Sequence, residues 1–368
     1  MSNIYVSRPL LPKFDEYTLL IRSIWENNIL TNNGPLLQRF ERELSMYLGL
    51  ENISVVANGM LGLTTVLQAM DLKGEVITSP YSFVATTHSI LMSGLKPVFV
   101  DISPSDFNID CSLIEGAITD ETCAIMAVHC YGNPCAVEEI ERIAQRYGLK
   151  IIYDAAHAFN VSTSAGSLLR EGDASVLSFH ATKVMNTFEG GAIVSRDSAI
   201  KDAVNIARNF GITDEDNIPF VGANAKMSEL HAAAGILQLR TVADAIAERR
   251  EISDYYTSEL AEINGIDVIE PDASVIRNYS YFPIIVRDDF AVDRDTLYKS
   301  MKSNGIFARK YFYPLLSNLP MYKDLPSAAS GLLPVAQYAS AHVLCLPIYP
   351  GLKRSDQDRV LNVITGIK

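Results

Sequence analysis

The sequence predicts an α/β fold, with a large domain built on a mostly parallel sheet flanked by helices and a small C-terminal α+β domain. Short apolar runs alternate with segments of helical period, as in strand-helix-strand units. The apolar runs are unbroken, as expected for strands buried on both faces of a sheet. A length of 368 residues suits a large domain plus a smaller one. We expect the large domain over residues 1–240 and the small one over residues 241–368.

The elements of the large domain follow from these runs in chain order. Apolar composition predicts strands at residues 51–58, 74–80, 96–102, 123–132, 150–158, 174–179 and 191–195. Helical spacing predicts helices at residues 61–70 and 136–148, and residues 81–94 fit either a helix or a turn.

The pattern changes at Ser228, which suits a helix N-cap. Residues 228–263 have helical character almost throughout and predict a connector between the domains. The small α+β domain is predicted from three segments beyond it, at residues 279–289, 295–306 and 356–367.

Charge and cysteine content narrow the class of protein. The formal net charge is -12, and no lysine/arginine block occurs, so binding to nucleic acid or to an anionic membrane is not expected. The five cysteines form no CxxC pair and no zinc spacing, which is typical of reduced thiols in a cytoplasmic protein without a metal site. No signal peptide and no membrane-spanning apolar run is evident.

Ligands of an open parallel sheet bind where its strands end, so the residues after each strand are the candidates for a site. Asn58 follows the first strand and can cap the next helix, while the free amides of Gly59 and Met60 face an anion. An ordinary Asn-Gly helix start explains the same residues. Asp154 ends another strand among alanines, where a carboxylate needs a cationic partner or serves only as a helix cap.

Lys183 stands alone in a polar turn after the strand at residues 174–179. A solvated loop lysine is the ordinary explanation for such a residue. Next to a positive ring and away from water, however, a lysine loses its proton more readily and becomes a nucleophile and base. We attribute the following Gly190-Gly191 pair to the room that a substrate needs beside this amine.

Together these residues suit one cofactor, pyridoxal 5'-phosphate, which passes through a pyridoxamine 5'-phosphate form. It needs a lysine for its Schiff base, a carboxylate at its pyridine nitrogen and an anion cradle for its phosphate. Lys183 and Asp154 can supply the first two, and Gly59, Met60 and Ser178 the cradle. Phe83 could stack on the ring, although plain core packing explains it too.

Several motifs, in order along the chain, resemble the DegT/DnrJ/EryC1/StrS family of sugar aminotransferases. The most specific are "DAAHA", "SFHATK" ending in Lys183, and "EGGAIV". Others are "NNGPLLQRFERELSMYLGL", "SPYSFVATTHSI", "VHCYGNP", "GANAKMSELHAAAGILQL", "GIFARKYFYPLL" and "LCLPIYPGL". The resemblance covers nearly the whole chain. It implies the fold-type I architecture, with a seven-stranded sheet, and a pyridoxal-phosphate enzyme.

The resemblance also implies roles by position. Lys183 is expected as the Schiff-base lysine, Asp154 as the partner of the ring nitrogen and Ser178 as a phosphate ligand. His157 falls beside the ring. Asn224 falls where the family sends an asparagine to the phosphate of the neighbouring subunit, which implies a homodimer with shared active sites.

Two residues depart from the family pattern. Met60 offers no hydroxyl where threonine is common, so one phosphate contact should rest on its backbone amide. Lys226 stands where arginine is common, which puts that contact in doubt.

Within the family, the motifs are most similar to those of enzymes that aminate C4 of a nucleotide-linked 4-keto-6-deoxyhexose. The resemblance implies transfer of the amino group of L-glutamate, with dTDP-4-keto-6-deoxyglucose as the expected sugar, for surface polysaccharide such as O-antigen. Substrate contacts are expected from Arg309, Tyr311 and Tyr313 in "RKYFYPL". The alternatives are a 3-keto-sugar or cyclitol aminotransferase, and a non-catalytic regulatory or binding module. A dehydratase of this family carries histidine in place of the lysine, so Lys183 argues against it.

Overall fold

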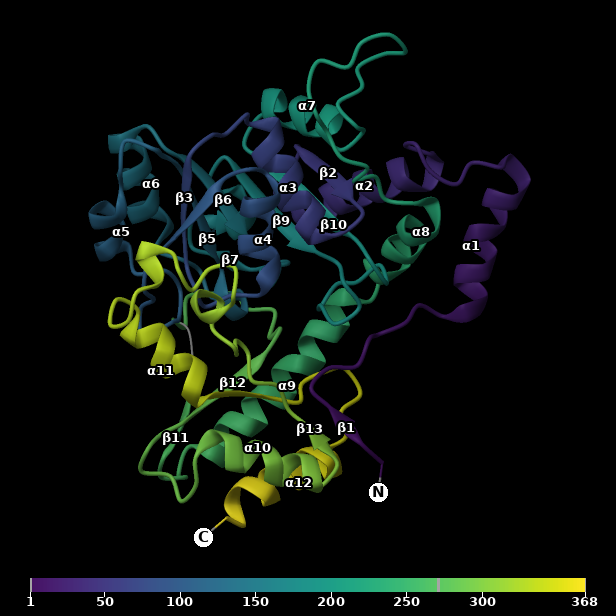
Figure 1. Ribbon diagram of the computed structural model, residues 1–368. Coiled ribbons are helices and arrows are strands. Elements are labelled where there is room, and N and C mark those ends of the chain that lie inside the picture. The colour runs from purple at the N-terminus through teal and green to yellow at the C-terminus, as the bar shows by residue number, and fades with distance from the viewer. Residues whose placement is uncertain (1, 270–271, 368) are drawn as a thin grey trace.

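The computed structural model describes residues 2–269 and 272–367, which form two main sheets and two short strand pairs, with helices around them (Figure 1). The larger sheet has seven strands, in the spatial order β2 (Ile53–Val56), β10 (Gly191–Ser195), β9 (Ala174–Ser178), β6 (Lys150–Asp154), β5 (Thr122–Val128), β3 (Glu75–Thr78) and β4 (Lys96–Phe99). All neighbours are parallel except β10, which is antiparallel to both β2 and β9. This sheet confirms the predicted fold class.

Helices cover both faces of the seven-stranded sheet, because its strands are apolar on both sides. Along β6, Ile152 joins the core beneath α3, whereas Ile151 and Tyr153 join the core beneath α5 and α6. The helices of this part are α1 (Phe14–Asn27), α2 (Pro35–Leu48), α3 (Gly59–Ala69), α4 (Val84–Met92), α5 (Cys111–Ala117), α6 (Val137–Tyr147), α7 (Ser198–Ala207) and α8 (Glu229–Gln238).

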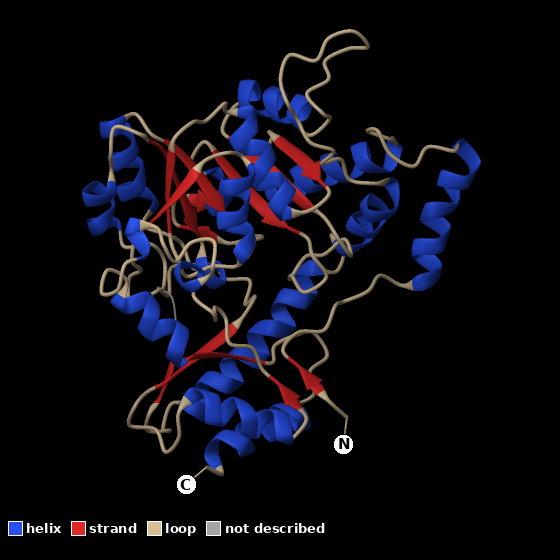
Figure 2. Ribbon diagram, in the orientation of Figure 1, coloured by secondary structure: helices blue, strands red, loops and turns tan. Residues whose placement is uncertain are grey.

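The smaller sheet is antiparallel and lies below the larger one in Figure 2, with strand order β11 (Ile266–Val268), β12 (Phe282–Val286) and β14 (Val343–Leu346). Around it lie α9 (Val242–Leu260), α10 (Arg294–Ser303), α11 (Pro334–His342) and α12 (Arg354–Thr365). The remaining short elements are β1 (Ile4–Tyr5), β7 (Ser162–Thr163), β8 (Gly166–Ser167), β13 (Ile306–Phe307) and the 3-10 turns Cys130–Gly132, Leu168–Arg170, Leu316–Asn318 and Pro326–Ala328.

The connector predicted at residues 228–263 consists of two helices instead of one. Ser228 caps α8 as expected, since its hydroxyl accepts a hydrogen bond from His231 N. The helix stops after Gln238, and α9 begins at Val242. From there α9 runs between the two sheets (Figure 1).

The N-terminal strand β1 pairs with β13, and Ile4 packs in the core of the smaller sheet together with α9 and α12. The first residues therefore lie with the C-terminal part of the chain, and both ends of the chain lie at that end of the molecule (Figure 1). The domain boundary between residues 240 and 241 stays a prediction, but β1 does not lie with the large sheet, where that division places it.

A side chain that is distant in the sequence accepts hydrogen bonds from the first amides of α2. Glu229, the first residue of α8, is 1% exposed and accepts hydrogen bonds from Leu36 N and Leu37 N, both at 2.8 Å. These amides have no partner inside their own helix. Gly34 allows this approach, because a Cβ there would lie 2.6 Å from Cδ of Glu229.

No helix in the described part of the chain combines the length and the apolar character needed to cross a membrane.

Candidate active site

A cavity of about 330 Å³ opens where β2, β6 and β9 end, as expected for a parallel sheet. Residues from the C-terminal part of the chain close its other side. The predicted site residues that line it are Gly59, Met60, Phe83, Asp154, His157, Ser178, Lys183, Arg309 and Tyr311.

The end of β2 and the start of α3 form one side of the cavity. Asn58 caps α3, and its Oδ1 accepts a hydrogen bond from Leu61 N at 2.9 Å. The first amides of the helix, at Gly59 and Met60, have no partner within it and suit an anion. A Cβ at Gly59 would lie 3.1 Å from Cβ of Ser178, so the glycine lets the end of β9 come close.

Asp154 ends β6 and is buried, with 7% of its surface exposed. Its Oδ2 accepts a hydrogen bond from Thr86 Oγ1 at 2.7 Å, and its Oδ1 accepts one from Ala156 N at 3.2 Å. Burial raises the pKa of this carboxyl, while the two hydrogen bonds and the charge of Lys183 lower it. Across the described residues it forms no ion pair, so a cationic ligand would satisfy it.

Lys183 lies in the loop between β9 and β10, where its backbone amide donates to His180 O at 2.9 Å. Its Nζ lies 3.3 Å from the hydroxyl oxygen of Tyr281. Removal from water lowers the pKa of Lys183 to about 8, although Asp154 and Tyr311 act in the opposite direction. This agrees with the prediction of a desolvated lysine that loses its proton readily.

His157 follows Asp154 by one turn and is buried. Its Nδ1 accepts a hydrogen bond from Tyr131 N at 3.2 Å, so the ring proton resides on Nε2. Burial holds the pKa of His157 well below its usual range, and the positive charge of Lys183 adds to this. His157 is therefore neutral at physiological pH.

A family model described as the DegT/DnrJ/EryC1/StrS aminotransferase family matches residues 15–365. The chain belongs to this family. The resemblance predicted from the motifs is thus confirmed.

Several known proteins are similar to nearly the whole of this chain. A dTDP-4-amino-4,6-dideoxy-D-glucose transaminase of Shigella dysenteriae is 48% identical over 365 residues, which are 99% of each chain. One of the same name from Escherichia coli is 46% identical over 99% of this chain and 98% of its own. A crystal structure of DesI, in the presence of its TDP-sugar product, superimposes with a TM-score of 0.94 at 32% identity, covering 99% of this chain and 92% of that chain.

The far side of the cavity in this aminotransferase is aromatic, and the sequence analysis missed part of it. Tyr281 and Phe312 line the cavity beside Tyr311. The carbonyl of Tyr311 accepts hydrogen bonds from the hydroxyls of Tyr81, at 2.8 Å, and Tyr131, at 2.6 Å. Tyr281 directly precedes β12, and no local pattern distinguishes it from the other tyrosines of its segment.

Gly190 and Gly191 have a different role from the predicted one. A Cβ at Gly190 would lie 2.0 Å from Thr187 Oγ1, and one at Gly191 would lie 3.0 Å from Gly59 N. Neither glycine lines the cavity. The interpretation that they make room for a substrate is therefore wrong, because they allow close packing behind the cavity instead.

Two predicted residues lie outside the cavity. Tyr313 is 56% exposed and packs against Lys310, whose Nζ is 4.6 Å from the ring centroid. Asn224 is exposed and pairs with Asn209 in an isolated bridge. Their predicted roles toward substrate and phosphate stay predictions.

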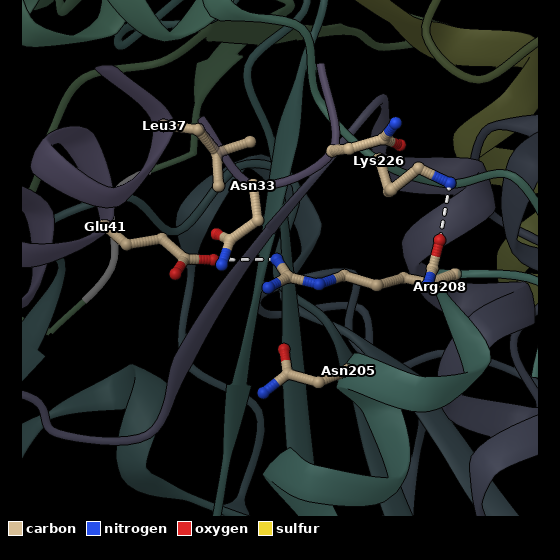
Figure 3. A pocket seen from close by; sticks show the side chains of 8 residues that line it. Asn33, Leu37, Glu41, Asn205, Arg208 and Lys226 are labelled. Atoms are coloured by element: carbon tan, nitrogen blue, oxygen red, sulfur yellow. Dashed lines mark hydrogen bonds and ion pairs between the residues drawn. The ribbon is translucent and has the colours of Figure 1, made fainter. Parts of the chain in front are cut away.

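Lys226 lines a separate polar pocket of about 390 Å³ (Figure 3). Its Nζ donates to Asn209 Oδ1 at 2.8 Å, and burial together with the charge of Arg208 lowers its pKa. Arg208 in turn forms an ion pair of 2.7 Å with Glu41. Within this chain the amine of Lys226 therefore has Asn209 as its partner, and its contact with a ligand is untested.

Proposed function

We propose that this chain is a pyridoxal-phosphate-dependent aminotransferase that moves the amino group of L-glutamate to C4 of dTDP-4-keto-6-deoxyglucose. The product would be dTDP-4-amino-4,6-dideoxy-D-glucose. The observation that carries the chemistry is the presence of the Lys183 amine, the Asp154 carboxylate and the open end of α3 in one cavity. The two relatives named above, at 48% and 46% identity over 99% of this chain, support the choice of substrate.

The residues of the cavity fit pyridoxal phosphate. Its phosphate suits the amides of Gly59 and Met60 and the hydroxyl of Ser178, which come together because Gly59 has no side chain. The buried carboxylate of Asp154 suits its protonated ring nitrogen. Phe83, 58% exposed at the rim, is free to cover the ring, and His157 lies beside Asp154.

When bound, the cofactor supplies a carbonyl that bonds amines and a cationic ring that withdraws electrons from the reacting carbon. Lys183 then acts as the proton carrier. Its Nζ removes the proton from Cα of glutamate in the first half-reaction and delivers a proton to C4 of the sugar in the second. A pKa of about 8 keeps both the neutral and the protonated amine accessible near neutral pH. Asp154, fixed by Thr86 and Ala156, presents a negative charge toward the ring.

The test is incubation of the purified protein with pyridoxal phosphate, L-glutamate and a panel of 4-keto and 3-keto sugar nucleotides. We expect dTDP-4-keto-6-deoxyglucose to be consumed as 2-oxoglutarate forms, and NMR to locate the new amine at C4. Amination only at C3 would replace this function by that of a 3-keto-sugar aminotransferase. A colourless protein that cannot be reconstituted with the cofactor would indicate a non-catalytic module.

We also propose that the chain forms a homodimer in which Asn224 reaches the phosphate site of the partner. The segment between α7 and α8 extends away from the body of the molecule (Figure 1). It carries Ile218 and Val221, which are 62% and 82% exposed. Exposed apolar side chains on an extended segment suit burial against a second copy.

Mixing two inactive variants tests this shared site. Asn224→Asp should be inactive, because a carboxylate would repel the phosphate at close range. A mixed dimer contains one Asn224→Asp chain and one Lys183→Ala chain. One of its two sites then carries both substitutions, and the other carries neither. Random assortment then restores roughly a quarter of wild-type activity, since half of the dimers are mixed and each has one intact site. If mixed dimers form and the mixture is no more active than its parents, the shared site is rejected.

A further inference from the structure

Tyr281 contacts the amine of Lys183, and the family resemblance assigns no role to this tyrosine. Its hydroxyl oxygen lies 3.3 Å from Lys183 Nζ, and the same Nζ lies 5.7 Å from the centroid of its ring. Within the part of the chain that the structure describes, this is the hydrogen bond that Nζ makes. An ammonium group prefers both an oxygen acceptor and the face of an aromatic ring.

The position of this hydroxyl is fixed from several sides. The Tyr281 ring lies edge-on to His157, with centroids 4.8 Å apart, and contacts Tyr131 and Tyr311 at 5.8 and 5.5 Å. The preceding residue, Ser280, is bound to the turn after β6, because its Oγ donates to His157 O at 3.1 Å.

Arg249 secures the same segment from α9. It is 3% exposed, and its guanidinium donates to the carbonyls of Tyr279, Ser280 and Ile348 at 3.3, 3.4 and 3.0 Å. A buried arginine that donates hydrogen bonds to three carbonyls restricts the backbone conformation next to Tyr281.

We propose that Tyr281 is a positioning residue for Lys183, whose hydroxyl accepts a hydrogen bond from the ammonium form and so holds the proton on Nζ between its two transfers. The proposal rests on the proposed function, in which Lys183 leaves the cofactor and carries a proton. Burial raises the pKa of Tyr281, so this phenol stays neutral and acts as an acceptor without removing the proton.

The other groups that face Lys183 determine the sign of the expected change. Asp154 favours the protonated amine, and Tyr311 does so when ionised. His157 is neutral, as argued above. Because Tyr281 adds a hydrogen bond to the ammonium form, its loss should lower the pKa of Lys183 below its present value of about 8.

The experiment compares Tyr281→Phe with Tyr256→Phe in the cofactor-free protein. Tyr256 is a buried phenol near Phe282 whose hydroxyl has no hydrogen-bond partner in the described structure, so it controls for removal of a buried hydroxyl. Acetic anhydride labels neutral amines, and mass spectrometry of the Lys183 peptide across a pH series gives the pKa of Lys183. We expect a fall of about one unit in Tyr281→Phe and none in Tyr256→Phe.

The loaded enzyme provides a second measurement. Tyr281→Phe should lower kcat by roughly tenfold to a hundredfold with little change in KM for the sugar nucleotide, since the hydroxyl acts on Lys183 and not on substrate. An unchanged Lys183 pKa in a variant with wild-type melting temperature would overturn the proposal, whatever happens to kcat. A lowered pKa in a protein that aminates no sugar nucleotide would uphold the role of Tyr281 and reject the proposed function.

Discussion

The two sides of the cavity are built in different ways. On one side, which we call the sheet wall, Gly59, Met60, Asp154, Ser178 and Lys183 each lie at or just after the end of a strand. The other side, the aromatic wall, consists of Tyr281, Tyr311 and Phe312. These residues come from two distant segments and contact Tyr131, which lies behind them.

The difference suggests that the sheet wall carries the groups that react and that the aromatic wall positions them. Residues of the sheet wall are placed by the backbone of a buried sheet, so their positions are rigid and suited to bonding a cofactor. Residues of the aromatic wall are placed by contacts with other rings, and Tyr281 also contacts Lys183. The largest loss of rate is therefore expected from changes in the sheet wall, and smaller losses from changes in and behind the aromatic wall.

The largest effect is expected for Lys183→Ala. Without the amine the reaction loses its proposed proton carrier, so the rate of 2-oxoglutarate formation should fall by at least about 1000-fold. The variant should still fold, with an unchanged melting temperature, and should still hold pyridoxamine phosphate noncovalently. Turnover within about tenfold of wild type would show that Lys183 is not the proton carrier.

The second largest effect on the rate is expected for Asp154→Asn. A neutral amide cannot hold the ring nitrogen protonated, so we expect roughly a hundredfold lower kcat and loss of cofactor on dialysis. The matched control is Thr86→Val, which removes one hydrogen bond to the same carboxylate and should lose much less. If Asp154→Asn keeps full activity, the carboxylate is only a cap for the turn that follows β6.

Gly190→Ala tests the packing behind the sheet wall. A Cβ there would meet Thr187 Oγ1 and, at 2.6 Å, Met227 Cε, so the free energy of unfolding should fall by about 1–3 kcal/mol. Chemical denaturation of the cofactor-free protein measures this loss. Gly116→Ala is the control, because a Cβ at this helical position has nothing within 4 Å and should not destabilise. Equal stability of the two variants would contradict the packing role assigned to Gly190.

The smallest effect is expected behind the aromatic wall. Tyr131→Phe removes one of the two hydroxyls that donate to Tyr311 O, while Tyr81 keeps the other in place. The single variant should have nearly wild-type kinetics. The double variant with Tyr81→Phe leaves this carbonyl without either donor and should raise KM for the sugar nucleotide several-fold with kcat nearly unchanged. Strictly additive effects of the two changes would contradict this shared role.

The same contrast explains which parts of the site were predictable from the sequence. The strands that carry Asp154 and Ser178 are continuous apolar runs, so their ends, and the residues placed there, follow from local pattern. Asn58 was predictable as a cap for the same reason. Tyr281 was not, because its place beside Lys183 depends on the contacts between the segment before β12 and the turn after β6.

Some features of the fold could not be predicted from the sequence for the same reason. Helical periodicity continues through residues 239–241, yet the chain turns there, because α8 packs against α2 near the large sheet while α9 packs in the core of the smaller one. The pairing of β1 with β13 joins residues about three hundred positions apart and has no local signature.

The cap that Glu229 provides for α2 has a consequence for the growing chain on the ribosome. The carboxylate lies 193 residues downstream of Leu36, whose amide it satisfies. At translation rates of roughly 5–20 residues per second, α2 is synthesised about 10–40 s before its cap exists. During that interval its first amides remain exposed to water, and its apolar face lacks α8. Helix α2 therefore reaches its final state only after more than half of the protein has been made.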